Sequence, residues 1–277
     1  LGSGAMGIAL TTGTDNVAIG ENALDAVTAG TDNVAVGDGA GGAITTGVGN
    51  IAIGADALDA VTTANSNVAV GMAALGANTG ANNTAVGDNA LLVNTTGAAN
   101  TALGAFALDA NTTASNNTGL GYAALSVNTT GTSNTAVGYA SLAGNTTASN
   151  NTAVGFDSLT GTTTGAANTA VGKDSLRTNS TGAQNIAVGN ASLELNTTGS
   201  YNVGLGDFAL YNNTTASNNV AVGKDALLAN TTGANNVAIG SLTLDANTTA
   251  NDNTAVGQGS MSANTTGAGN TAVGLSS

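Results

Sequence analysis

A five-residue motif, Asn-x-Ala-Val-Gly, recurs along the whole chain at a fixed short interval. Its glycine occurs sixteen times, from Gly20 to Gly274, and every interval is 17 residues except the 16 residues between Gly71 and Gly87. A unit this short cannot bury a core alone, so neighbouring units must stack. We therefore expect residues 1–277 to form one continuous solenoid of about sixteen coils, beginning and ending in mid-repeat as a segment of a longer fibre.

We number each coil from the asparagine of this motif, which is position 1. Position 3 is Ala or Gly, position 4 is Val, Ile or Leu, and position 9 is Leu in thirteen of fifteen complete coils. Positions 2 to 4 alternate as in a strand, and Gly at position 5 permits a turn with positive φ. We expect a second short extended run around position 9. Because Gly and Asn recur in every coil, a helix fits poorly.

Stacking of the strands predicts an all-β fold, a parallel β-solenoid with one 17-residue coil per repeat. Identical side chains of successive coils should form ladders. The motif residues expected to form turns and ladders are Asn134, Gly138, Asn151, Gly155, Asn168, Gly172, Asn185 and Gly189. The expected core ladders contain Val137, Leu142, Val154, Leu159, Val171 and Leu176.

The charged and aromatic side chains mark the expected surface. All nineteen charged residues and all seven aromatic residues lie at positions 6, 7, 10 and 17, which should be solvent-exposed corners. The candidate display corners are Tyr122, Tyr139, Phe156, Phe208 and Tyr211. The net charge of −13 argues against nucleic acid and anionic membranes as partners. No apolar run is long enough to span a membrane, so we expect no membrane insertion.

The chain lacks the residues that most catalytic and metal sites use. It contains no His and no Cys, and no base recurs beside a nucleophile. We therefore expect no enzyme, no cofactor and no metal site; a polysaccharide-acting enzyme would need paired acids in a groove. Calcium-binding solenoids carry acids at a fixed position, whereas here they are scattered over four. A disordered chain has no reason to keep Val and Leu in phase.

The stretch Asn-Thr-Ala-Val-Gly-Tyr-Ala-Ser-Leu-Ala-Gly-Asn-Thr-Thr at 134–147 resembles repeats of bacteriophage tail-fibre and bacterial surface-fibre proteins. Asn-Val-Ala-Ile-Gly, at 16–20 and 236–240, is similar to the motif of trimeric autotransporter adhesin heads, which are parallel β-rolls with a shorter unit. The resemblance implies a structural or adhesive rod in an extracellular, cell-surface or virion fibre. The uncharged face of positions 1 to 5 and the uncapped coils predict self-association, as a parallel homotrimer or end to end; the surface receptor is of unknown identity.

Thr at positions 13 and 14 suggests an alternative function. A ladder of Thr on a stiff solenoid is what ice-binding proteins present. Thr also suits a turn, however, where its hydroxyl can bond to the next coil, and we prefer this interpretation because exposed Asn residues and variable corners interrupt the Thr face.

Two further expectations concern packing. Position 3 is never larger than Ala, so it must be crowded, either from inside the coil or by another chain packed against positions 1 to 5. The coil between Gly71 and Gly87 lacks one residue in Asn78-Thr79-Gly80. We expect this corner to absorb the deletion and leave the strands in register.

Overall fold

The structure is a computed structural model that describes residues 4–5 and 12–277. The chain divides into two compact units, Leu1–Val137 and Gly138–Ser277. The expected mid-repeat start at Leu1 and Gly2 lies outside the described residues. In the first unit the strands are β1 (Val17–Ile19), β2 (Val34–Val36), β3 (Ile51–Ile53), β4 (Val68–Val70), β5 (Thr84–Val86), β6 (Thr101–Leu103), β7 (Thr118–Leu120) and β8 (Thr135–Val137). In the second unit they are β9 (Thr152–Val154), β10 (Thr169–Val171), β11 (Ile186–Val188), β12 (Val203–Leu205), β13 (Val220–Val222), β14 (Val237–Ile239), β15 (Thr254–Val256) and β16 (Thr271–Val273).

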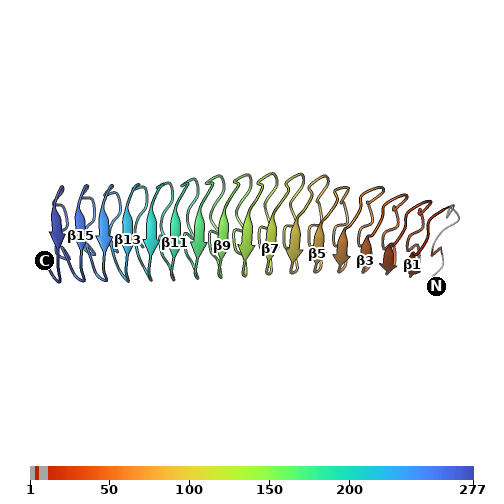
Figure 1. The fold of residues 1–277 in the computed structure, drawn as a ribbon, viewed down its shortest axis with the longest axis horizontal. Helices are drawn as coiled ribbons and strands as arrows, with labels where there is room; N and C mark the ends of the chain where they lie inside the picture. Colours follow the sequence, from red (N-terminus) through yellow and green to blue (C-terminus); the bar gives the residue numbers. More distant parts are fainter. Residues whose placement is uncertain (1–3, 6–11) are drawn as a thin grey trace. The chain divides into compact units, whose positions relative to one another are not determined.

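Each strand covers positions 2 to 4 of its coil and pairs in parallel with the same positions of the next coil of its unit (Figure 1). The register is regular, as in β9 and β10, where Thr152 lies opposite Thr169 and Val154 opposite Val171. Among the described residues no helix occurs. The prediction of an all-β parallel solenoid with one coil per repeat is therefore confirmed.

The shortened coil keeps this register. Strands β4 and β5 pair with Val68 opposite Thr84, an offset of 16 residues. The side-chain amide of Asn78 donates to the carbonyl of Gly80 at 2.8 Å, and the Gly80 N–H donates back to Asn78 Oδ1 at 3.2 Å. The corner thus closes without position 14, and the prediction that it absorbs the deletion is confirmed.

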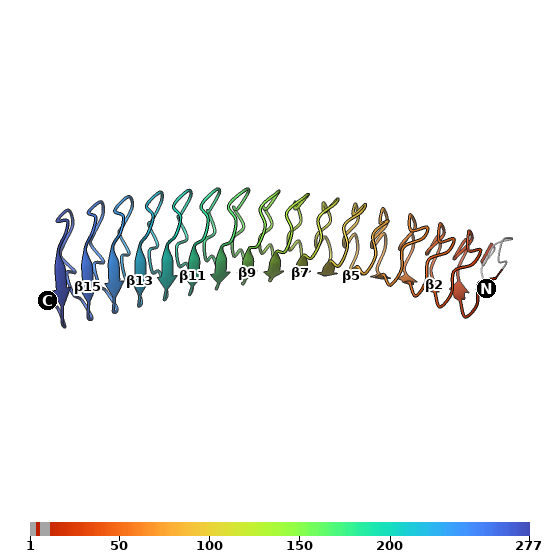
Figure 2. The ribbon, with the colours of Figure 1, turned by 45° about the horizontal axis from the view of Figure 1, so that its top comes forward.

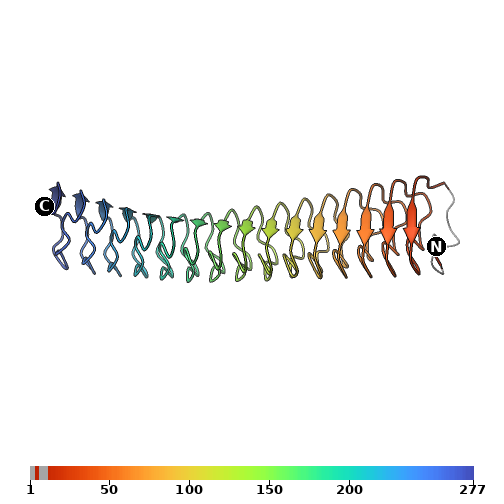
Figure 3. The same ribbon diagram turned by 90° about the horizontal axis from the view of Figure 1, so that it is seen from below.

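The remainder of each coil consists of turns and bends, which lie apart from the strands in Figures 2 and 3. Gly at position 5 leaves the strand with a positive φ, 131° at Gly138 and 141° at Gly155. The expected extended run around position 9 is wrong, because positions 7 and 9 adopt left-handed φ values, 48° at Ala140 and 54° at Leu142. The Asn145 N–H also donates to the Leu142 carbonyl at 3.2 Å, which closes a turn rather than a strand.

The core is filled by side chains at positions 1, 3, 8, 9, 12 and 15. Leu142, Leu159 and Leu176 are fully buried, as predicted. The prediction that position 4 also lies in the core is wrong. Its side chains point outward, as Val137, Val154 and Val171 do, and Val171 is 37% exposed.

The physical reason is the narrow space inside the coil. Strand side chains alternate between the two faces, so an inward position 3 forces positions 2 and 4 outward. The strand lies close to Leu at position 9, since a Cβ built on Gly119, at position 3, would be 3.3 Å from Leu108 Cγ. Only Ala or Gly fits there. The crowding that the sequence indicated at position 3 therefore comes from inside the coil.

Two buried ladders of asparagine amides run beside the leucines. The backbone N–H of Asn185, at position 1, donates to Asn168 Oδ1 at 2.9 Å, and the side-chain amide of Asn185 donates to the Gly199 carbonyl at 2.8 Å. Asn196, at position 12, donates to Asn179 Oδ1 at 2.8 Å and to the same Gly199 carbonyl at 2.9 Å. In coils that have Asn at position 12, the two ladders thus share one carbonyl, and both of its lone pairs are used.

Candidate functional surfaces

The turn and ladder residues predicted from the sequence belong to the scaffold. Asn151, Asn168 and Asn185 are fully buried, and the Asn168 N–H donates to Asn151 Oδ1 at 2.8 Å. Asn134 is equally buried and donates its N–H to Asn117 Oδ1 at 2.9 Å. The glycines that follow the strands have the expected positive φ: Gly138, Gly155, Gly172 and Gly189. The residues available for contacts with other molecules therefore lie on the outer surface of the coils.

The first surface, which we call the strand face, consists of the outward side chains at positions 2 and 4. Position 2 carries Val, Ile or Thr, and position 4 carries Val, Ile or Leu in all sixteen coils. Several of these side chains are more than one-third exposed, including Ile19, Ile53, Leu103, Ile186 and Val188. No charged residue occupies either position. Each unit therefore carries an uncharged, mostly apolar stripe along its strands.

The second surface, the threonine corner, consists of positions 13 and 14. The hydroxyl at position 13 donates to the position 13 carbonyl of the next coil. Thr112 donates to Thr129 at 3.1 Å, Thr197 to Thr214 at 3.0 Å, and Thr231 to Thr248 at 3.0 Å. The interpretation that Thr bonds to the next coil is thus correct for position 13. The Thr side chains at position 14 are exposed, and their hydroxyls do not form this bond to the next coil.

The third surface, the display corner, consists of positions 6, 7 and 10. Tyr139 and Phe156 are 51% and 47% exposed, and their rings stack with centroids 5.1 Å apart and an interplanar angle of 9°. Tyr122 is also exposed and packs edge to face on Phe106. Phe208 and Tyr211 are half-buried and pack edge to face, with centroids 5.6 Å apart. The predicted corners thus carry small aromatic clusters that span adjacent coils or neighbouring turns.

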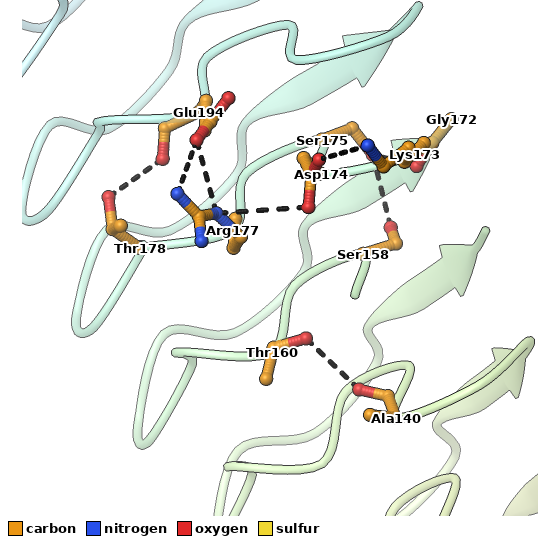
Figure 4. Close-up of polar contacts among 10 residues, drawn as sticks. All are labelled: Ala140, Ser158, Thr160, Gly172, Lys173, Asp174, Ser175, Arg177, Thr178 and Glu194. Atoms are coloured by element: carbon orange, nitrogen blue, oxygen red, sulfur yellow. Dashed lines mark hydrogen bonds and ion pairs between the residues drawn. The ribbon is translucent and has the colours of Figure 1, made fainter. Parts of the chain in front are cut away.

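A charged network occupies the display corner of two adjacent coils (Figure 4). Arg177 Nε and Nη2 donate to Glu194 Oε1 at 3.1 and 2.5 Å, and Arg177 Nε lies 3.8 Å from Asp174 Oδ1. Lys173 Nζ lies 3.3 Å from Asp174 Oδ2. The hydrogen bond to Glu194 is the main cause of the raised pKa of Arg177. Glu194 is buried at position 10, and most other residues at this position, such as Asp109 and Ala143, are half-buried, so the expectation that position 10 is exposed is wrong in most coils.

Position 10 also holds acids that the fold partly removes from water. Burial raises the pKa of Asp109 and of Asp245, and one carboxylate oxygen of each is buried without a hydrogen-bond partner. Burial is also the main cause of the raised pKa of Asp59, and repulsion from Asp56 adds to it. These aspartates are spread over distant coils, so they do not form a paired acid–base site.

Within residues 4–5 and 12–277, no group of three or more His, Cys, Asp or Glu side chains could hold a metal ion. In the same part of the chain, no helix is long and apolar enough to cross a membrane. Comparisons of the chain with known protein families, characterised proteins and solved structures found no match.

Proposed function

We propose that the chain is the structural and adhesive rod of an extracellular or virion fibre, in which copies associate side by side through the strand face. Its function is mechanical. Each coil is joined to the next by backbone hydrogen bonds and by buried amide bonds, as between Asn185 and Asn168. Bending a coil away from its neighbour would break several of these bonds together. The display corner then presents variable side chains to a surface receptor.

The observation that carries the proposal is the composition of position 4. It points outward, yet it is aliphatic in all sixteen coils. Exposed position 6, by contrast, varies from Glu21 to Lys173 and Phe156. Hydration of a continuous aliphatic stripe is unfavourable, and burying apolar surface stabilises association by about 25 cal/mol per Å². A partner surface that covers position 4 explains why polar residues are absent there.

A second copy of the chain is the partner that matches this stripe coil by coil. Any partner must repeat at the strand spacing to cover every coil, and a parallel copy has that spacing. Eight three-residue strands per unit make a stripe of about 38 Å by 10 Å. Two copies that pair through both units would bury about 1,500 Å², close to the about 1,600 Å² of a stable protein interface.

Sedimentation and light scattering of the purified chain test this association. The wild-type chain should have a mass that is a multiple of its 26.0 kDa, and we expect a parallel homotrimer. Val171→Lys and Val188→Lys place charges on the strand face of adjacent coils, and together they should shift the mass toward the monomer. Asn190→Lys and Asp207→Lys, at position 6 of two successive coils, are the controls and should leave the mass unchanged.

Electron microscopy separates this arrangement from end-to-end stacking. Side-by-side copies should give bundles thicker than one chain, and the strand-face lysines should make them thinner. A wild-type chain that remains monomeric at high concentration would overturn the proposal. Filaments of single-chain thickness that survive both lysines would instead show that association occurs through the ends of the solenoid.

A further inference from the structure

Position 14 combines exposure with a single residue type. It is Thr in every coil except the one with Ala29 and the shortened coil, and each of these threonines is exposed. Position 17, by contrast, varies freely and carries Asp32, Ser133, Gln184 and Tyr201. The fold gives an exposed side chain little reason to be uniform. An external contact explains the uniformity.

The structure distinguishes the two adjacent threonines chemically. At position 13 the hydroxyl is used within the fold, as in Thr197, which donates to the Thr214 carbonyl at 3.0 Å. At position 14 no threonine hydroxyl donates to any described residue, as in Thr198 and Thr215. The backbone N–H of Thr198 does bond to the next coil, at 3.3 Å, so its backbone is held while its side chain faces water.

The result is a rank of free hydroxyl and methyl groups at one per coil. Parallel pairing sets their separation at about 4.8 Å. All charged residues are absent from positions 12 to 16, so no ion disturbs the water beside this rank. Thr offers both a hydroxyl that bonds to water and a methyl group that orders it. Ser would lack the methyl group and Val the hydroxyl, and neither replaces Thr at position 14.

We propose that the position 14 rank binds ice. The rigid ladder holds water at regular intervals along each unit, and this ordered water freezes onto the crystal surface. The ligand is the crystal face of ice and not a dissolved molecule. This activity is independent of the strand face, because positions 2 and 4 of the same coils lie on the strands and the threonine corner lies in the turns (Figure 3).

Thermal hysteresis and the shape of ice crystals, measured by nanolitre osmometry, test the proposal. The wild-type chain should lower the freezing point below the melting point and should facet the crystals. The double variant Thr198→Lys and Thr215→Lys, in adjacent coils of one unit, should lose at least half of the hysteresis. Asn190→Lys and Asp207→Lys add the same number of lysines to the same two coils and should retain it.

Single replacements separate the contribution of the Thr hydroxyl from that of the Thr methyl group. Thr198→Val keeps the methyl group and should retain most of the hysteresis, whereas Thr198→Ser should lose more. Circular dichroism and melting curves establish that each variant is folded. Val171→Lys and Val188→Lys on the strand face should lower the mass of the assembly in solution and leave the thermal hysteresis unchanged. Failure of the fibre proposal can therefore be distinguished from failure of the ice-binding proposal. A folded wild-type chain that neither facets ice nor produces hysteresis overturns the inference.

Discussion

The first coils and those that follow them in the same unit fill position 12 in opposite ways. Val27, Ile44 and Val61 occupy it in the first three coils, and Asn78 begins the amide ladder that continues through Asn94. Both sets are buried. The strands nevertheless keep the same register, with β3 and β4 paired as β5 and β6 are. The coil therefore accepts either an aliphatic or an amide ladder at this position.

The aliphatic ladder and the amide ladder at position 12 differ in how they tolerate substitutions in neighbouring side chains. Aliphatic side chains can shift to fill space, as they do around Gly41, the position 9 residue of its coil. A Cβ built there would lie 3.0 Å from Ile44 Cδ1 and 3.1 Å from Leu24 Cδ2, so these neighbours occupy the space that a Leu would fill. Amides are bonded to the coils on either side and cannot move in this way. We therefore expect substitutions in the amide ladder to cost more than substitutions in the aliphatic ladder.

The largest effect should come from position 9, which both kinds of coil share. Leu142→Asp buries an unpaired charge and should destabilise the adjacent coils by about 4 kcal/mol or more. Ala143→Asp, at position 10 of the same coil, is the matched control and should cost far less, because position 10 carries acids elsewhere. Urea unfolding followed by circular dichroism measures both. Equal effects would contradict the assignment of position 9 to the core.

The amide ladder should be the next most sensitive element. Asn111→Val removes the bonds to Asn94 Oδ1 and from the Asn128 amide, which are 2.8 and 2.9 Å long. Buried polar groups that lose their partners cost about 1–3 kcal/mol each, so we expect a loss of about 2–5 kcal/mol. Ile44→Val, in the aliphatic ladder, should cost about 0.5–1.5 kcal/mol. Similar losses for the two variants, measured by thermal unfolding, would remove the distinction between the ladders.

The amide ladder is interrupted at one coil, where inserting an Asn should increase stability. Thr162 occupies position 12 between Asn145 and Asn179, and its buried hydroxyl has no hydrogen-bond partner. Thr162→Asn should donate to the Gly165 carbonyl and accept from the Asn179 amide, which stabilises the second unit by about 1–2 kcal/mol. Thr164→Asn, at the exposed position 14, should change the stability little. Hydrogen exchange that slows around residues 162–179 only in the first variant would sharpen the comparison.

The smallest effect concerns pH. Burial raises the pKa of Asp109, so the folded chain binds this proton more tightly than the unfolded chain does. Ionised Asp109 therefore lowers stability at neutral pH, and this loss is recovered as the pH falls through the raised value toward the unfolded 3.8. Asp109→Asn should be more stable than wild type at pH 7 and should lose this advantage near pH 4. The exposed Asp25 provides the control substitution, and an Asp109→Asn advantage that persists at pH 4 would refute the assignment.

Much of the fold was predictable because the 17-residue period restricts the structures that the chain can form. A 17-residue repeat with β-branched residues at position 2, aliphatic residues at position 4 and a glycine after them permits few structures besides stacked parallel coils. The buried ladder of Leu142, the turn at Gly138 and the repaired register after Asn78 follow from the same pattern. The exposed aromatic corners were also predictable, because only positions that face solvent tolerate Tyr139, Phe156 and charged residues alike.

Which face of the strand lines the core was decided only by the tertiary structure. Positions 2, 3 and 4 are all uncharged, so alternation permits either Ala136 or Val137 to point inward. Leu at position 9 folds across the coil and leaves room for no side chain larger than Ala, which turns Val137 outward and creates the strand face. The same holds for the threonines. The sequence reads Thr-Thr in almost every coil, and only the path of the backbone determines that the first hydroxyl bonds to the next coil while the second faces water.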